Sequence, residues 1–335
     1  YAAVLFGVKL GPIQVAQATI ILLWLAALLN FGGNRWTGRI SNITVWGAII
    51  PVILVGTIGW YWFDPELYWS AWNPGNLPFF DAVSASISMT LWAFLGFESA
   101  AANADAVENP KKNVPIATFF GTLIVAVIYV FSTNVMAGIV PNFDLLNSTA
   151  PFGLTFTYMF NGYIGKLVMA TMIISCFGAL LCWQFTISRV FKTCAEEGLF
   201  PKIFAHVNDK DAPIKGLLII LVVQSTMALA TANESLYRQF ENLVNLAVCS
   251  NVVPYILSCL AVPRLFREEG ASSGRIKRTI PLLVIALIYC AYAIYATGPI
   301  AMVGSAVAIS IGICIYLVAF VIYPRVISAR KKQVS

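Results

Sequence analysis

Charged residues are scarce in this sequence. Lys, Arg, Asp and Glu together make up 11% of the 335 residues, whereas hydrophobic residues make up 59%. Ordinary soluble domains contain about 25% charged residues, and the mean hydropathy here is +0.80. This composition excludes a soluble globule and predicts a membrane protein with several spans.

Histidine is almost absent, and the cysteines form no recognisable motif. His206 stands alone in a polar loop, so the chain can build neither a histidine metal site nor a histidine proton relay. The seven cysteines include no CxxC pair, and we interpret them as reduced, apolar packing residues. We therefore expect neither a metal nor a cofactor. The apolar segments also lack paired carboxylates for general acid–base chemistry, which argues against a membrane-embedded enzyme.

Nine segments are long and apolar enough to cross a bilayer as helices. They lie at about 13–30, 43–62, 82–104, 115–140, 163–190, 214–232, 240–263, 278–296 and 299–323. None shows the alternating pattern of a barrel strand. The predicted fold class is an all-α polytopic membrane protein with a single transmembrane domain over residues 1–335. Residues 1–8 resemble the tail of another helix, so we expect further helices before Tyr1. The stretch NFGGNRWTGRIS (residues 30–41) is predicted to be a turn.

Basic residues are distributed unevenly between the two sides of the predicted membrane. Of the 21 Lys and Arg residues, all but Lys9, Lys166 and Arg238 fall in alternate loops on one side. Because cytoplasmic loops are rich in Lys and Arg, this distribution places the carboxyl terminus in the cytoplasm. The formal charge of +6 therefore reports orientation in a lipid bilayer, and no nucleic-acid partner is expected.

The span at 82–104, AVSASISMTLWAFLGFESAAANA, carries a carboxylate near its middle. A charged side chain at bilayer depth costs roughly 2.5 to 3.5 kcal/mol on insertion scales, so Glu98 is expected to face a cavity or a partner. Gly96 favours a break into two half-helices, such as those that bind ligands in secondary transporters. Trp92 adds a π face, and the two groups together suit an organic cation. The alternative is that Gly96 is a packing contact and that Glu98 only bonds a neighbouring helix.

Other aromatic residues allow both a structural and a functional interpretation. Trp183 lies inside an apolar span, where its ring suits either core packing or a cavity wall. Five aromatic side chains gather after the second span, and we interpret them as an interfacial belt rather than a binding cage. These five are Trp60, Tyr61, Trp62, Tyr68 and Trp69. Asp64 and Glu66, which lie among them, could still attract cations.

Several stretches are similar to one transporter family. They are TLWAFLGFESAAANADAVENPKKNVPIATFFGT, NSTAPFG, CWQFTISRVFK, EEGLFPKIFAHV and NLVNLAVCSNVVPYILS. These stretches resemble the basic amino acid and polyamine antiporter family of the amino acid, polyamine and organocation superfamily, and among its members the bacterial exchangers of putrescine and ornithine. The pattern WxFxGxES followed by ENPxxNVPIA is specific to exchangers of basic amino acids and diamines. The resemblance covers nearly the whole chain.

The resemblance implies a LeuT-like fold of twelve helices, in which two five-helix repeats have inverted topology and helices one and six are broken at the substrate. By this resemblance the nine spans are helices four to twelve, and residues 82–104 form the broken sixth helix. The glycine-rich motif of helix one, which would hold a substrate carboxylate, would then precede Tyr1.

The resemblance also implies the residues of a substrate site. Trp92 would be the aromatic gate over the substrate, Leu95 an apolar contact on the unwound segment, and Glu98 the gating and recognition carboxylate. Trp183 would be the aromatic residue at the middle of the pathway, and Tyr255 the inner gate.

The function implied by the resemblance is exchange of putrescine for ornithine by alternating access in a bacterial inner membrane. The partners would be these small cations, the lipid bilayer and, as in many family members, a second copy in a homodimer. Related arginine–agmatine exchangers contact substrate through serines where this sequence has Ala179 and Ala247, which favours a smaller or less polar cation. A lysine–cadaverine or arginine–agmatine exchanger remains an alternative, as does a diamine sensor that does not transport.

Overall fold

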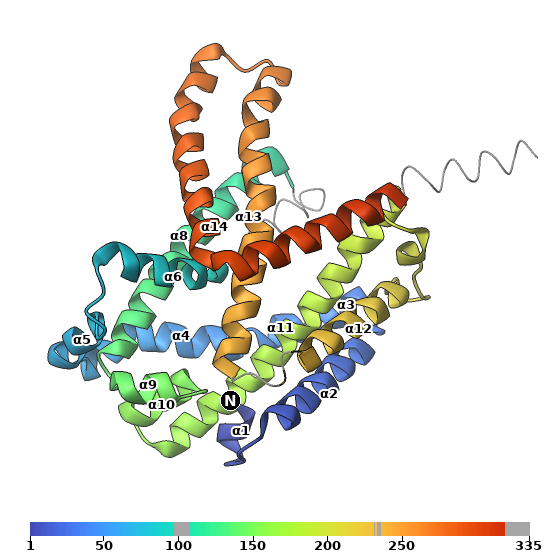
Figure 1. Ribbon diagram of the computed structural model, residues 1–335. Helices are drawn as coiled ribbons and strands as arrows, with labels where there is room; N and C mark the ends of the chain where they lie inside the picture. The colour runs from blue at the N-terminus through green and yellow to red at the C-terminus, as the bar shows by residue number, and fades with distance from the viewer. Residues whose placement is uncertain (97–107, 231, 233–235, 319–335) are drawn as a thin grey trace, which may run out of the picture. The chain divides into compact units, whose positions relative to one another are not determined.

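The computed structural model describes residues 1–96, 108–230, 232 and 236–318. Across these residues every regular element is a helix (Figure 1), which confirms the predicted all-α class. The chain divides into two compact units. Of the described residues, the first unit comprises 1–75, 123–230, 232 and 315–318, and the second comprises 76–96, 108–122 and 236–314.

The first unit is organised around one long helix, α11 (Gly162–Glu196). Its larger neighbours in this unit are α2 (Pro12–Asn30), α3 (Asn34–Thr44), α4 (Trp46–Ile58), α10 (Pro151–Met159) and α12 (Ile214–Ala230). The shorter elements of the unit are α1 (Ala2–Leu5), α5 (Pro65–Trp72), α9 (Asn142–Asn147) and the 3-10 helices η1 (Gly59–Trp62) and η3 (Lys202–Ala205). Figure 1 shows α2 and α12 along the carboxyl-terminal half of α11.

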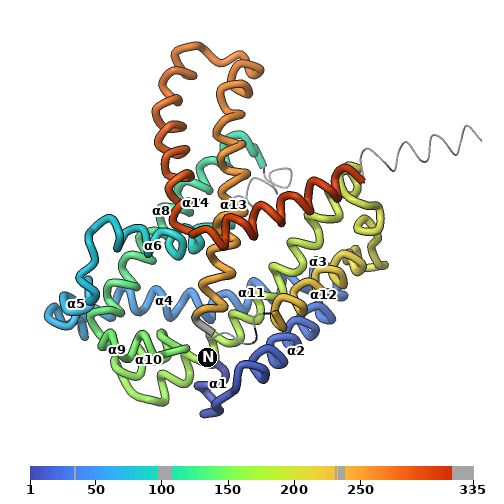
Figure 2. The backbone as a smooth tube through the Cα atoms, viewed as in Figure 1, coloured from blue at the N-terminus to red at the C-terminus, as the bar shows by residue number. Residues whose placement is uncertain are grey.

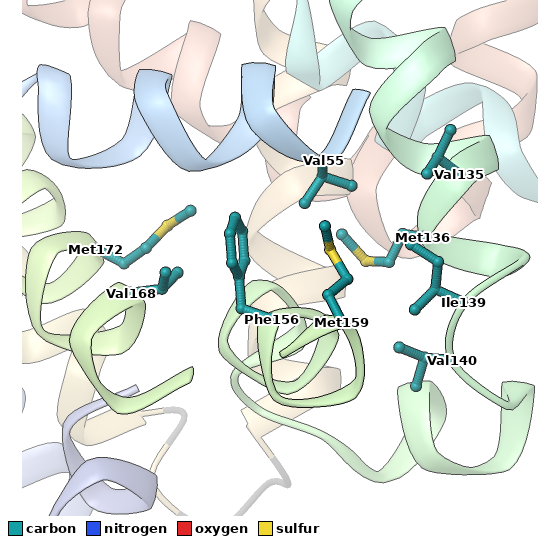
Figure 3. Packing of buried hydrophobic residues seen from close by; sticks show 9 residues of the cluster. All are labelled: Val55, Val135, Met136, Ile139, Val140, Phe156, Met159, Val168 and Met172. Atoms are coloured by element: carbon teal, nitrogen blue, oxygen red, sulfur yellow. The ribbon is translucent and has the colours of Figure 1, made fainter. Parts of the chain in front are cut away.

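A buried apolar cluster joins α4, α10 and α11 to the end of α8 (Pro110–Ala137) (Figure 3). Its members are Val55, Val135, Met136, Ile139, Val140, Phe156, Met159, Val168 and Met172. In Figure 3 the side chains of Phe156 and Met159 point from α10 toward Val55 of α4. The methionines are unbranched and adaptable, so they fill the irregular gaps between helices that cross at different angles. This packing fixes the last turns of α4 and α8 relative to each other.

The second unit contains α6 (Phe79–Ala93), the first part of α8, α13 (Leu236–Glu268) and most of α14 (Ser273–Tyr316). α6 contacts α13, and a buried cluster joins α13 to α14. This cluster consists of Val244, Val248, Val252, Cys290 and Ala293. The valines recur every four residues, so they form one stripe along α13. α14 changes direction at Gly298, whose φ of 80° is not helical (Figure 2).

Six helices within the described residues are long and apolar enough to cross a membrane. They are Pro12–Asn30, Arg35–Trp62, Pro110–Ala137, Gly162–Glu196, Arg238–Glu268 and Ser273–Tyr316. The sequence predicts nine spans, and the two sets differ in three places. α6 has 15 residues and α12 has 17, which is shorter than the roughly 20 residues of a typical span. α14 covers the segment predicted at 278–296 and residues 299–316 of the segment predicted at 299–323, on either side of Gly298.

The predicted turn at 30–41 is mostly helical. Only residues 31–33 lie between α2 and α3, and α3 begins at Asn34. Buried polar side chains explain the difference. The Asn30 amide donates to the carbonyl oxygen of Leu181 at 3.0 Å, and its side-chain oxygen accepts a bond from the Thr37 hydroxyl at 2.9 Å. The first bond attaches the end of α2 to α11, and the second attaches α3 to the end of α2. A stretch rich in glycine and polar residues is therefore stabilised as helix by its contacts.

Candidate substrate site

α6 ends in the region where the sequence predicts a break in the central span. The last helical residue is Ala93, and the N–H of Phe94 donates to the carbonyl oxygen of Leu91 at 3.0 Å. Gly96 then has a φ of 112°, a backbone conformation that residues with a side chain rarely adopt. The glycine therefore permits the chain to leave the helix direction at this point. Glu98, the predicted recognition carboxylate, lies outside the described residues.

Trp92 stands on the last turn of α6 with 41% of its surface exposed. Its ring meets the ring of Phe240 on α13 edge to face, with the ring centroids 5.2 Å apart and the planes at 87°. Aromatic pairs in this geometry stabilise each other by about 0.5 to 1.5 kcal/mol beyond the area that they bury. The contact fixes the indole, and a large part of the indole surface stays available to a ligand.

Leu95 and Tyr255 pack against the same buried cluster of α13 and α14. The N–H of Leu95 donates to the carbonyl oxygen of Trp92 at 3.1 Å, so the chain stays close to the end of α6. Tyr255 is partly buried on α13, three residues after Val252 of the stripe. Leu95 and Tyr255 therefore share one packed cluster, whereas Trp92 contacts α13 at Phe240, fifteen residues before Tyr255.

Trp183 belongs to the first unit and lies on α11. Its residue surface is 49% exposed, whereas the next residue, Gln184, is 1% exposed. The Gln184 amide donates to the carbonyl oxygen of Leu23 on α2 at 3.3 Å and to the side-chain oxygen of Gln224 on α12 at 2.9 Å. Because these bonds hold that face of α11 against α2 and α12, Trp183 lies outside the packed face. Trp183 is therefore not a core residue of its unit.

Phe240 and Gln184 are the contacts that sequence reasoning missed. Phe240 lies four residues before Val244, so it continues the stripe along α13, and this spacing could have identified it. Gln184 gives no comparable signal, because a single amide in an apolar span has many possible partners. Among the described residues, no group of His, Cys, Asp and Glu is placed to hold a metal ion.

The loop between η3 and α12 carries a separate cluster of charges. The carboxylate of Asp211 accepts bonds from Arg189 Nη1 at 2.8 Å and from Lys192 Nζ at 2.9 Å, both on α11. The bond from Lys192, followed by that from Arg189, lowers the pKa of Asp211 below its ordinary value. In the same loop the Asn208 amide donates to the carbonyl oxygen of Phe31 at 3.1 Å. The loop is thus attached to the ends of both α2 and α11.

The family model described as amino acid permease matches residues 1–324 of this chain. The chain belongs to the amino acid permease family. This permease is 53% identical over 316 residues to the putrescine transporter PotE of Haemophilus influenzae, and the match covers 94% of this chain and 73% of that protein. It is 52% identical over 316 residues to the putrescine transporter PotE of Escherichia coli K12, and the match covers 94% of this chain and 72% of that protein. It is 30% identical over 312 residues to the cadaverine/lysine antiporter of Escherichia coli K12, and the match covers 91% of this chain and 69% of that protein.

These matches confirm the family that the sequence motifs predict. Together with the long apolar helices, membership makes this permease a multi-pass membrane protein and a transporter rather than an enzyme.

Proposed function

We propose that this permease is a secondary antiporter that exchanges putrescine for ornithine by alternating access. The observation that carries the proposal is its identity of 53% and 52% to two relatives named putrescine transporters. Identity to the cadaverine/lysine antiporter is 30%. The exposed Trp92 on the last turn of α6, shortly before Gly96, supports the same function, because ligands of secondary transporters bind where a helix is interrupted.

The proposed site matches the chemistry of a short aliphatic diamine. Putrescine has a four-carbon chain with an ammonium group at each end, so it needs both apolar cover and negative charge. Trp92 and Trp183 each offer an indole ring to the chain and to an ammonium group, and Leu95 adds an apolar contact. Glu98 pairs with an ammonium group, and Tyr255 closes the path on the cytoplasmic side.

Coupling between the two substrates requires no covalent step. A carboxylate at bilayer depth is costly when it has no partner, and a bound substrate supplies that partner at Glu98. The loaded protein therefore changes between its outward and inward states more readily than the empty protein. A substrate shifts this equilibrium only by its difference in affinity for the two states.

The proposal includes a bacterial inner-membrane location with a cytoplasmic carboxyl terminus, supported by the distribution of Lys and Arg. It also keeps the nine predicted spans as helices four to twelve of a LeuT-like inverted-repeat fold in one transmembrane domain. Family members often form homodimers, and we propose the same assembly here.

Counterflow in vesicles tests the exchange. The purified full-length protein is reconstituted in vesicles loaded with unlabelled putrescine, and uptake of labelled ornithine is followed. We expect uptake that requires internal putrescine and that exceeds uptake of labelled lysine or arginine. Faster counterflow of lysine against cadaverine, or of arginine against agmatine, would identify the alternative substrate pairs. Putrescine binding without any counterflow would identify a sensor.

The substitution Glu98→Gln tests the recognition carboxylate. It removes the charge and keeps the shape of the side chain, so we expect membrane insertion to be unchanged and putrescine counterflow to fall by at least about tenfold, since hydrogen bonds to charged groups are worth about 1.5 to 3 kcal/mol. Counterflow and the amount of membrane-inserted protein are measured in the same preparation. Unimpaired counterflow would show that Glu98 does not bind substrate.

A further inference from the structure

A pocket of about 300 Å³ lies within the first unit, where η1 and α5 meet the end of α8. It is lined by Trp60, Phe63, Tyr68, Val130, Phe131 and Asn134. Ring centroids of neighbouring walls are 4.9 Å apart for Trp60 and Phe63, and 5.4 Å apart for Phe63 and Tyr68. The Phe131 ring stands 6.1 Å from that of Trp60, at 74°. Four of the six lining residues are therefore aromatic and form connected walls.

Contacts inside the unit hold these walls in place. The Phe63 ring lies directly over Gly138, where the Cβ of any larger residue would overlap it. The N–H of Asp64 donates to the carbonyl oxygen of the same glycine at 2.8 Å. The Tyr68 hydroxyl donates to Asn134 Oδ1 at 2.5 Å. The pocket is thus a built feature of the contact between α5 and α8, and not a gap between loose side chains.

The polar atoms of the lining already bond to the protein. The indole N–H of Trp60 donates to the carbonyl oxygen of Gly56 at 3.1 Å. The Asn134 amide donates to the carbonyl oxygen of Val130 at 2.7 Å, and its oxygen accepts the Tyr68 hydroxyl. The interior therefore offers ring faces and apolar side chains, which suit a methylene chain or the weakly solvated part of an organic cation.

Two carboxylates lie close along the chain to residues of the lining, outside the lining itself. Asp64 directly follows Phe63 of the wall, and its carbonyl oxygen accepts the N–H of Tyr68 at 3.0 Å. Its carboxylate caps α5, while Glu66 stands in the first turn of α5, and both side chains are exposed. Residues 40–110 and 113–165 contain no Lys or Arg, so no basic residue from these stretches neutralises the two carboxylates. An elongated cation with an apolar middle is complementary to this arrangement.

We propose that this pocket is a second, peripheral binding site for an alkyl diammonium ion. The methylene chain lies against Trp60, Phe63 and Tyr68, and one ammonium group lies at Asp64 and Glu66. The inference rests on the proposed function for the identity of the ligand, and it adds a site outside the transport path. Trp69 and Tyr61, which are 66% and 86% exposed, keep the role of interfacial belt residues.

Equilibrium binding of labelled putrescine to the purified full-length protein tests the proposal. The wild type is expected to bind putrescine at two sites of different affinity per chain. The double variant Asp64→Asn, Glu66→Gln removes both charges and keeps the cap of α5, because Asn caps a helix about as well as Asp. We expect the Kd of the weaker site to rise by about three- to tenfold, consistent with the contribution of two exposed charge contacts, while counterflow at saturating putrescine is unchanged.

Two single variants separate the pocket from the belt. Trp60→Leu removes one wall and is expected to weaken the same site about tenfold. Tyr61→Leu is the control, because it removes an exposed aromatic residue of the belt that does not line the pocket and whose ring contacts Trp62, which does not line it either. It is expected to keep both sites.

The outcomes also distinguish this proposal from the proposed function. A wild type that exchanges putrescine but binds it at only one site per chain overturns the peripheral site and leaves the exchange function intact, and a pocket filled by lipid would give this result. A double variant that binds putrescine at two sites with unchanged Kd values would also overturn the peripheral site. A protein that neither binds nor exchanges putrescine overturns both proposals.

Discussion

Trp92 and Phe240 form the contact on which the geometry of the proposed site depends most directly. The two rings come from α6 and α13, and each is more than two fifths exposed. A ring that is held by one edge and open elsewhere can bind a cation without first losing much side-chain freedom. Under the proposed function, Phe240 is a positioning residue for Trp92.

The pair can be tested by substitution. Phe240→Leu removes the edge contact and keeps Trp92, so we expect the KM for putrescine counterflow to rise about three- to tenfold, in line with the 0.5 to 1.5 kcal/mol of an aromatic pair. Trp92→Leu is expected to raise KM further. The double variant should resemble Trp92→Leu alone, because Phe240 acts only through Trp92. If the increases in KM of the two single variants simply add in the double variant, Phe240 does not act through Trp92.

A matched control exists in the same unit. Phe119 on α8 is 65% exposed and also forms a T-shaped contact with another ring, that of Phe120. Phe119→Leu should leave the KM for putrescine unchanged. A similar rise in that variant would indicate a general effect of lost aromatic packing.

At this scale the sequence locates residues with unusual local chemistry but not their partners. Trp92 and Gly96 are identified because a glycine and an aromatic residue interrupt an apolar span beside a carboxylate. The contact of the Phe63 ring with Gly138 could not be predicted, because the two residues are 75 positions apart and neither is unusual alone. Gln184 escapes prediction for the same reason, since its partners lie on two other helices.

Helices and their ends could be predicted better than contacts between side chains, although packing moved some of the helix ends. Pro12 begins α2 because proline suits the first turn of a helix, and Gly298 divides α14 between the spans predicted at 278–296 and 299–323. The predicted turn at 30–41 is wrong over most of its length, because Asn30 and Thr37 bond across helices and stabilise α3. Local composition indicates only the intrinsic helix propensity of a stretch, and buried polar contacts can outweigh that propensity.

The loop held by Asp211 gives a prediction that depends on pH. Asp211→Asn removes the two ion pairs to Arg189 and Lys192. The Asp211 side chain is 54% exposed, so each pair is worth about 0.2 to 1 kcal/mol, and we expect the midpoint of thermal unfolding at pH 7 to fall by about 1 to 4 °C. Asp209→Asn in the same loop is the control, and it should leave the midpoint unchanged.

The sign of the pH dependence follows from the pKa of Asp211, which is lower in the folded protein than its ordinary value. The stabilisation is therefore fully present above the ordinary aspartate pKa of about 3.9 and is lost as the pH falls through the lowered pKa. The difference between the wild type and Asp211→Asn should close in that acidic range. A difference that stays constant on acidification would show that the ion pairs do not stabilise the loop.

For the whole molecule, the orientation in the membrane decides which side each site faces. The predicted spans place the loop after α4 and the loop before α11 on the same, outer side. They place the loop held by Asp211 in the cytoplasm. The peripheral pocket would then meet external amines, and Asp211 would act inside the cell.

Labelling of single cysteines tests this orientation. The seven natural cysteines are first replaced, and one cysteine is then introduced either at Tyr163, which is 87% exposed, or at Lys202, which is also exposed. A maleimide that cannot cross membranes should label Tyr163→Cys in intact cells and Lys202→Cys only after permeabilisation, with counterflow retained in both variants. The opposite pattern would contradict the cytoplasmic carboxyl terminus, and the aromatic pocket would then face the cytoplasm. A peripheral site there would bind putrescine on its way out of the cell instead of collecting it from the medium.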